Sequence, residues 1–201
     1  MKIAVLGAKN VGSTLAGQWA RAGHAVMFGV RTVDNSATQA LAQELGVSVG
    51  TVAEAIAFGA VVVFAIPGNA MDETIQAHRA ALADKIVIDA ANRMGGAAMN
   101  SAASFATQAP GALVYRAFNS LGWENFADPI FGDTPADLLY CGPAGAGQTA
   151  VETLIRDCGL RPVRVGDLSQ IGLVDMLASL WFALAFGQGM GRNLAFKVLT
   201  R

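Results

Sequence analysis

Residues 2–12, KIAVLGAKNVG, decide the fold of this chain. The apolar run Lys2–Leu6 predicts a buried strand, Gly7 follows it as a tight turn, and Gly12 falls where a helix has to pack closely against a sheet. A helix that begins after such a turn offers free backbone N–H groups and the positive end of its dipole. The stretch therefore predicts a strand–turn–helix unit that binds the pyrophosphate of a dinucleotide.

One residue of this turn departs from the usual GxGxxG pattern. Lys9 stands at the position of the middle glycine, which normally leaves room for the pyrophosphate. We expect the Lys9 side chain to point outward and to bring its ammonium near a phosphate. Asn10 and Val11 complete the predicted phosphate-binding turn.

The rest of the chain alternates apolar, β-branched runs with Ala-rich helical stretches, a pattern typical of parallel sheets. Strands are predicted at Lys2–Leu6, Ala25–Val30, Val61–Ala65, Lys85–Asp89, Ala112–Ala117, Leu138–Cys141 and Pro162–Val165. Helices are predicted at Val11–Ala22, Asn35–Leu45, Val52–Phe58, Ala70–Leu82 and Ala146–Asp157, with a long, glycine-interrupted helical region over Leu168–Leu199. The fold class predicted is α/β: a Rossmann-type doubly wound, mostly parallel sheet with helices on both faces. Residues 1–166 would form this domain, and residues 167–201 a helical extension packed on it or on a dimer partner.

The composition narrows the possible functions. The chain has 201 residues, of which 53% are hydrophobic and 14% charged, and its net charge of −1 gives no basic surface for nucleic acid. Its two cysteines form no CxxC pair, so we expect a reduced, cytoplasmic protein. The apolar segment Ile171–Met190 contains Asp175 and Gln188, and we expect a buried or dimer-interface helix there rather than a membrane span.

The end of the second predicted strand indicates which dinucleotide binds. An NAD site usually has an acidic residue here, whereas this chain has Arg31 and Thr32, and a guanidinium suits a 2′-phosphate. Asp34 is expected to cap the next helix instead. The sequence therefore predicts NADP(H) as the cofactor.

Further stretches extend the comparison over the whole chain. After GAKNVG and GVRT come VVFAIPGNAM, IVIDAANRM, YRAFNSLGWENF, ADLLYCG and LWFALAFGQGMGRNLAFKVL. In this order they resemble the NADPH-dependent coenzyme F-420 reductase family, which is also similar to the nucleotide-binding domain of membrane metalloreductases. The resemblance implies hydride transfer between NADP(H) and a deazaflavin (coenzyme F-420) or flavin ring.

The resemblance also implies the remaining site residues, at the carboxyl ends of the strands. Those placed along the ribose and nicotinamide, on the two sides of the cleft, are Ala65, Ile66, Pro67, Ala91 and Asn92. Asn119 would orient the carboxamide or the acceptor ring, and it is the nearest candidate for a catalytic residue. No acid, base or nucleophile is expected, because the cofactor carries the chemistry and the fold supplies proximity. No metal-ligand spacing is present in the sequence.

The acceptor is left open by the sequence. Coenzyme F-420 has an anionic tail, for which Arg93, Arg116 and Arg192 are only scattered candidates, so an ordinary flavin or another small redox acceptor is an alternative. Met94 and Trp123 are candidates for an apolar wall against the acceptor ring.

Two other functional classes also remain possible. One is a non-catalytic NADP(H)-binding redox sensor or subunit. The other is a reductase of imines or hydroxyacids, which needs a long helical substrate domain that this short tail does not offer. A homodimer joined through the apolar C-terminal segment is expected.

Overall fold

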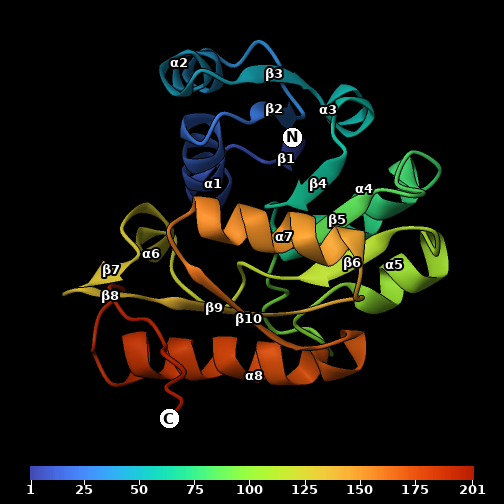
Figure 1. Cartoon of the computed structure of the whole chain (residues 1–201). Helices are drawn as coiled ribbons and strands as arrows, with labels where there is room; N and C mark the ends of the chain where they lie inside the picture. Colours follow the sequence, from blue (N-terminus) through green and yellow to red (C-terminus); the bar gives the residue numbers. More distant parts are fainter.

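Eight strands form the central sheet in the computed structural model, which describes residues 1–201 (Figure 1). They are β1 (Lys2–Leu6), β2 (Ala25–Val30), β3 (Ser48–Thr51), β4 (Val61–Phe64), β5 (Ile86–Asp89), β6 (Leu113–Arg116), β9 (Asp137–Cys141) and β10 (Arg161–Gly166). Their order is β10-β9-β6-β5-β4-β1-β2-β3, and a separate hairpin pairs β7 (Ile130–Phe131) with β8 (Thr134–Pro135).

The order of the strands in the sheet determines where a ligand site is expected. From β1 the chain moves outward through β2 to β3, then returns to the other side of β1 and continues through β4, β5 and β6, all of them parallel. In such sheets ligands bind outside the carboxyl ends of the strands where the order reverses, here at β1 and β4. β9 and β10 are parallel to each other but antiparallel to β6. The predicted doubly wound, mostly parallel α/β fold is confirmed.

Helices cover both faces of this sheet. They are α1 (Asn10–Arg21), α2 (Ser36–Leu45), α3 (Val52–Phe58), α4 (Met71–His78), α5 (Ala102–Gln108), α6 (Glu124–Ala127), α7 (Ala146–Asp157) and α8 (Ile171–Phe182). Short helical turns are η1 (Gly68–Ala70), η2 (Leu168–Gln170) and the π-helical η3 (Ala183–Gly187). Figure 1 shows α7 and α8 on opposite sides of β9 and β10.

The core forms on both faces because successive side chains of a strand point in opposite directions. Along β1, Ile3 and Val5 belong to the larger apolar cluster, whereas Ala4 and Leu6 belong to the smaller one. The larger cluster is fixed in part by Trp19 of α1, whose indole Nε1 donates to the carbonyl of Leu154 in α7 at 2.9 Å. Strands covered in this way need continuous apolar runs, which is why the sequence pattern located them.

Two local predictions are wrong, and several short elements were not predicted. The helical region Leu168–Leu199 ends early: α8 and η3 stop at Gly187, and no helix follows, because Gly189 and Gly191 adopt φ values of 67° and 81°. Asn35, rather than Asp34, caps α2, since its side chain accepts from the N–H of Thr38. The elements that were not predicted are β3, α5, α6 and the hairpin of β7 and β8.

The C-terminal helical stretch is unusually apolar. Leu168–Gly187 is long and apolar enough to cross a membrane by length and composition, with a mean hydropathy of 1.5 over its most apolar window, 28% of which is buried. Beyond it, the chain returns to the sheet and Phe196 bridges to Asp137 at the start of β9. The division into residues 1–166 and 167–201 stays a prediction.

Candidate functional site

The turn after β1 requires glycine at two positions. Gly7 has a φ of 97°, and a Cβ there would lie 2.6 Å from the carbonyl oxygen of Ala65. A Cβ on Gly12 would lie 2.1 Å from the carbonyl oxygen of Gly7. Only glycine therefore lets α1 begin this close to the ends of β1 and β4, and the start of a helix offers free N–H groups that can bind an anion.

A cavity of about 660 Å³ opens beside this turn. It is bounded by the first turn, the end of β2 with the start of α2, the start of α3, and the segment from the end of β4 into α4. Its lining residues are Leu6, Gly7, Ala8, Lys9, Gly29, Val30, Arg31, Thr32, Asn35, Thr38, Val52, Ala65, Ile66, Pro67, Asn69, Ala70, Glu73 and Thr74. This volume is in the range of small-molecule and cofactor sites.

Seven of the predicted cofactor residues line this cavity. They are Gly7, Lys9, Arg31, Thr32, Ala65, Ile66 and Pro67. Asn10, Val11 and Gly12 form the start of α1 directly behind the turn and do not line it. The assignment of all of them as ligands stays a prediction.

The charges around the cavity fit an anionic dinucleotide. Lys9 and Arg31 are both exposed and are its only basic lining residues, one in the turn before α1 and the other after β2. Thr32 follows Arg31, and the α2 cap residue Asn35 and Thr38 lie nearby. No acidic residue stands at the end of β2. The cavity thus offers cationic and hydroxyl groups where a 2′-phosphate has to be held.

Sequence reasoning missed the part of the cavity formed by α2 and α4. Asn35 and Thr38 lie at the start of α2, four and seven residues after Arg31, so their closeness to Arg31 in the sequence could have indicated them. Glu73 and Thr74, in contrast, reach the cavity only because the crossover after β4 places α4 beside it. Nothing in their immediate sequence indicates this position.

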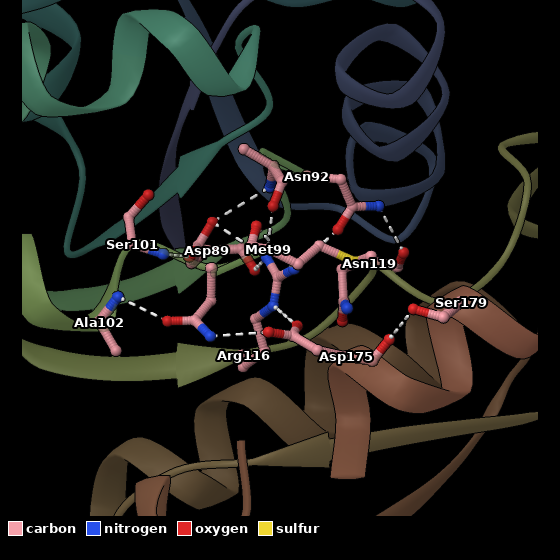
Figure 2. A network of polar contacts seen from close by, with 11 residues as sticks. Asp89, Asn92, Met99, Ser101, Ala102, Arg116, Asn119, Asp175 and Ser179 are labelled. Carbon is pink, nitrogen blue, oxygen red and sulfur yellow. Dashed lines mark hydrogen bonds and ion pairs between the residues drawn. The ribbon is translucent and has the colours of Figure 1, made fainter. Parts of the chain in front are cut away.

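The other predicted residues belong to a buried polar network at the ends of β5 and β6 (Figure 2). Its centre is Arg116, the last residue of β6, whose side chain is fully buried. Its Nε donates to Asp175 of α8 at 2.9 Å, and its Nη2 donates to the side-chain oxygen of Asn92 at 2.7 Å. Its Nη1 donates to the carbonyls of Asp89 and Ala91. Ala91 and Asn92 therefore do not line the cavity.

Asp89, the last residue of β5, is the second charge of this network. Its carboxylate lies 3.2 Å from Arg116 Nη1 and accepts from the backbone N–H groups of Ala91 at 3.2 Å and Ser101 at 2.9 Å. Burial raises the pKa of Asp89, and the charge of Arg116 and the two N–H donors oppose this rise. The carboxylate thus connects both ends of the loop between β5 and α5.

Asn119 joins the network through its backbone. Its carbonyl accepts from the Asn92 side-chain nitrogen at 2.8 Å, and Phe118 before it has a φ of 60°. The residue is 4% exposed, and neither polar atom of its buried side-chain amide has a partner. Such a group is costly to bury unpaired, so a ligand or water that satisfied it would gain binding energy. The role of Asn119 toward the carboxamide or the acceptor stays a prediction.

The three arginines considered for an anionic acceptor tail are all paired with carboxylates. Arg93 makes two bonds to Asp72 at 2.9 and 2.6 Å, and Arg192 bonds Glu124 at 2.5 Å. Hydrogen bonds from Arg93 and from Ser104 lower the pKa of Asp72. Arg116 is occupied as described above. Met94 is 66% exposed on its loop and Trp123 packs against the core; neither lines the cavity.

Comparison with known proteins agrees with this geometry. Residues 2–93 match the sequence model of the family described as NADP oxidoreductase, coenzyme F-420-dependent. A structure from Arthrobacter sp. FB24, named provisionally as an F-420-dependent NADP reductase, is 27% identical with a TM-score of 0.85 and covers 100% of both chains. A hypothetical protein from Sinorhizobium meliloti is 23% identical with a TM-score of 0.72, over 100% of this chain and 96% of its own.

A more distant structure shares the fold alone. The reductive aminase from Aspergillus terreus, solved with NADPH4, cyclohexanone and allyl amine, is 22% identical with a TM-score of 0.71. It matches 94% of this chain, which spans only 62% of the aminase. Among curated proteins, none matches the chain.

The switch-point cavity, its glycine turn and its two basic residues define a Rossmann-type NAD(P)-binding protein of the oxidoreductase class. More specifically, residues 2–93 match the sequence model of the coenzyme F-420-dependent NADP oxidoreductase family.

Proposed function

We propose that this protein is an NADP(H)-dependent reductase that transfers hydride between NADPH and a flavin-type or deazaflavin (coenzyme F-420) acceptor. The observation that carries the proposal is the pair of basic residues, Lys9 and Arg31, in the switch-point cavity of a family domain for such reductases. NADPH supplies the hydride when bound, so the protein has to bind, orient and shield it.

Each part of the cavity has a defined role in this proposal. The N-terminus of α1 binds the pyrophosphate, with the Lys9 ammonium beside it. Arg31 and Thr32 bind the 2′-phosphate, because a guanidinium presents paired donors to phosphate oxygens. Ile66 and Pro67 continue the wall toward the nicotinamide. Gly7 and Gly12 have no Cβ, which lets α1 begin close to the ends of β1 and β4.

The first test is a titration with NADPH and NADH, followed by nicotinamide fluorescence. The wild-type protein should bind NADPH more tightly than NADH. Arg31→Ala should weaken NADPH binding by about 10- to 100-fold, the loss of one charged hydrogen-bonding partner, and change NADH binding little. Arg79→Ala, which removes an exposed arginine outside the cavity, is the matched control and should bind as the wild type does. Equal losses for both nucleotides in Arg31→Ala would contradict the assignment.

An acceptor screen separates a reductase from a sensor. Steady-state oxidation of NADPH is measured with coenzyme F-420, FMN, FAD and riboflavin. Because Arg93, Arg116 and Arg192 are all engaged by carboxylates, an uncharged flavin such as riboflavin should serve at least as well as one with an anionic tail. Tight NADPH binding without turnover of any acceptor would instead identify a redox sensor or a subunit.

We further propose that the protein acts as a homodimer in the cytoplasm. Leu173, Met176 and Leu180 recur on one exposed face of α8 at helical spacing, and Phe186 continues it. A second copy would cover this face without exposing the helix to lipid. Light scattering should show a dimer for the wild type and for Met94→Glu, and a monomer for Met176→Glu. Co-sedimentation of the wild type with lipid vesicles would favour a membrane surface instead.

A further inference from the structure

We propose that Arg116 is a positioning residue for hydride transfer: it holds the segment Ala91–Asn92 at the nicotinamide end of the cleft. This inference rests on the proposed function and adds to it a residue that lies outside the cofactor cavity. It concerns the geometry of the reacting groups rather than cofactor affinity.

The buried guanidinium of Arg116 joins several segments of the chain. Arg116 ends β6, and its donors reach the end of β5, the loop after it and helix α8 (Figure 2). A buried ion pair contributes little net stability compared with apolar packing of the same volume. What it imposes is a single arrangement of its partners, because the planar guanidinium donates in fixed directions.

The segment that Arg116 holds lies next to Gly68. Gly68 directly follows the cavity wall formed by Ile66 and Pro67. A Cβ on Gly68 would lie 2.6 Å from the carbonyl oxygen of Asn92 and 2.7 Å from Cα of Arg93. The Asn92–Arg93 backbone thus lies against the end of that wall, and a displacement of the segment that begins at Ala91 alters the cleft beyond the cavity.

The side-chain amide of Asn92 relays the position of Arg116 to the turn after β6, because it bonds both Arg116 and the backbone of Asn119. A guanidinium only donates, so the side-chain oxygen of Asn92 has to face Arg116. The nitrogen of the same amide is thereby turned toward the carbonyl of Asn119, to which it donates at 2.8 Å. Arg116 consequently sets both the loop after β5 and the turn after β6, where Phe118 has its positive φ.

In the proposed reaction, the nicotinamide and the acceptor ring have to be held at a fixed distance and orientation. Hydride transfer depends on the distance between donor and acceptor carbons, and a displacement of about 1 Å can cost on the order of 100-fold in rate. The proposed contacts to adenine, ribose and phosphate come from residues that line the cavity, and Arg116 is not among them. Loss of Arg116 should therefore lower the rate of the chemical step and leave NADPH affinity nearly unchanged.

The test compares Arg116→Met, Arg116→Lys and Asn92→Ala with the wild type. In Arg116→Met the dissociation constant for NADPH should stay within about 3-fold, while the single-turnover rate falls by about 10- to 100-fold. The emission of bound NADPH should shift toward that of free NADPH, since the nicotinamide environment has changed. Arg116→Lys, which restores the charge but not the fork of donors, should recover only part of the rate.

The controls separate positioning from stability. Arg161→Met removes a bidentate arginine–carboxylate pair that shares no residue with the network; its melting temperature should fall while rate and emission stay at wild-type values. If Arg116→Met does not fold, Asn92→Ala provides the second variant. It breaks the same relay, but Arg116 keeps its ion pairs with Asp89 and Asp175. It should show the same loss of rate. Wild-type rate and emission in the folded Arg116 or Asn92 variants would overturn the proposal. If the wild type binds NADPH but reduces no acceptor, the proposed function fails, and the emission measurement still decides whether Arg116 positions the nicotinamide.

Discussion

At the scale of single residues, the glycines differ in what their missing Cβ allows. Gly12→Ala would place a methyl group 2.1 Å from a backbone oxygen that has no room to move, so we expect a loss of about 2–4 kcal/mol in the free energy of unfolding and loss of NADPH binding. Gly172, near the start of α8, has no atom within 4 Å of its would-be Cβ. Gly172→Ala should therefore stabilise the protein by up to about 1 kcal/mol.

Urea unfolding of both variants, with NADPH titration of each, measures this difference. Similar unfolding free energies for Gly12→Ala and Gly172→Ala would mean that the turn after β1 is looser than the structure shows.

The site residues that could be predicted from the sequence are those whose position follows from the residues next to them in the chain. Gly7, Lys9 and Arg31 sit at fixed offsets from the strand that precedes them, and the pattern indicates the site directly. Arg116 and Asp175 are 59 positions apart, and only the folded sheet brings them together. Their pairing could not be predicted because no local pattern relates a strand end to a distant helix.

At the scale of elements, α3 shows how a few side chains fix the beginning of a helix beside the cavity. Thr51 Oγ1 accepts from the N–H of Glu54 at 3.2 Å, and the Glu54 carboxylate accepts from the N–H of Thr51 at 2.7 Å. Thr51→Ala should lower the free energy of unfolding by about 1 kcal/mol. Thr107→Ala, in the last turn of α5, removes only bonds to carbonyls one turn back and should change it by less than about 0.5 kcal/mol.

Thermal or urea unfolding of these two variants provides the comparison. Equal effects would show that the reciprocal bonds at Thr51 do not stabilise α3.

Two of the elements that the sequence did not predict, β3 and α5, share a physical cause. β3 has only four residues, of which only Gly50 is buried, and it is a strand because it pairs with β2 rather than because it has an apolar run of its own. α5 starts at Ala102, next to Ser101, whose N–H is bonded by the distant Asp89. Tertiary contacts define both, whereas the strands β1 and β2 were predicted residue by residue because they are buried on both faces.

At the scale of the whole molecule, Asp137 ties the end of the chain to the sheet. Burial alone would raise its pKa, but hydrogen bonds from Arg161, from the N–H of Val198 and from Lys197 outweigh it, and the pKa falls to about 2. A pKa lowered by folding stabilises the folded state above the unfolded pKa of about 4, and this contribution is lost as the pH falls through 2.

We therefore expect the protein to lose about 1–2 kcal/mol of unfolding free energy from this group between pH 4 and pH 2. Asp137→Asn should be less stable at pH 7 and should show a flatter profile over that range. Asp128→Asn, an exposed position without an ion pair, is the control and should keep the wild-type profile. Parallel profiles for wild type and Asp137→Asn would contradict the assignment.

The same contacts have a consequence for the order in which the chain folds on the ribosome. The strands from β1 to β6 form their parallel ladders with one another, and these can pair once residue 116 has emerged, before Leu154 and Asp175 are available to Trp19 and Arg116. The start of β9 also needs Phe196, Lys197 and Val198, about 60 residues further on. At ordinary rates of synthesis this is a delay of about 3–12 s, during which the strands of the nucleotide-binding half can already be paired while the other edge of the sheet is open. Chaperones that bind nascent chains would therefore meet this protein as a half-finished sheet with one unprotected edge.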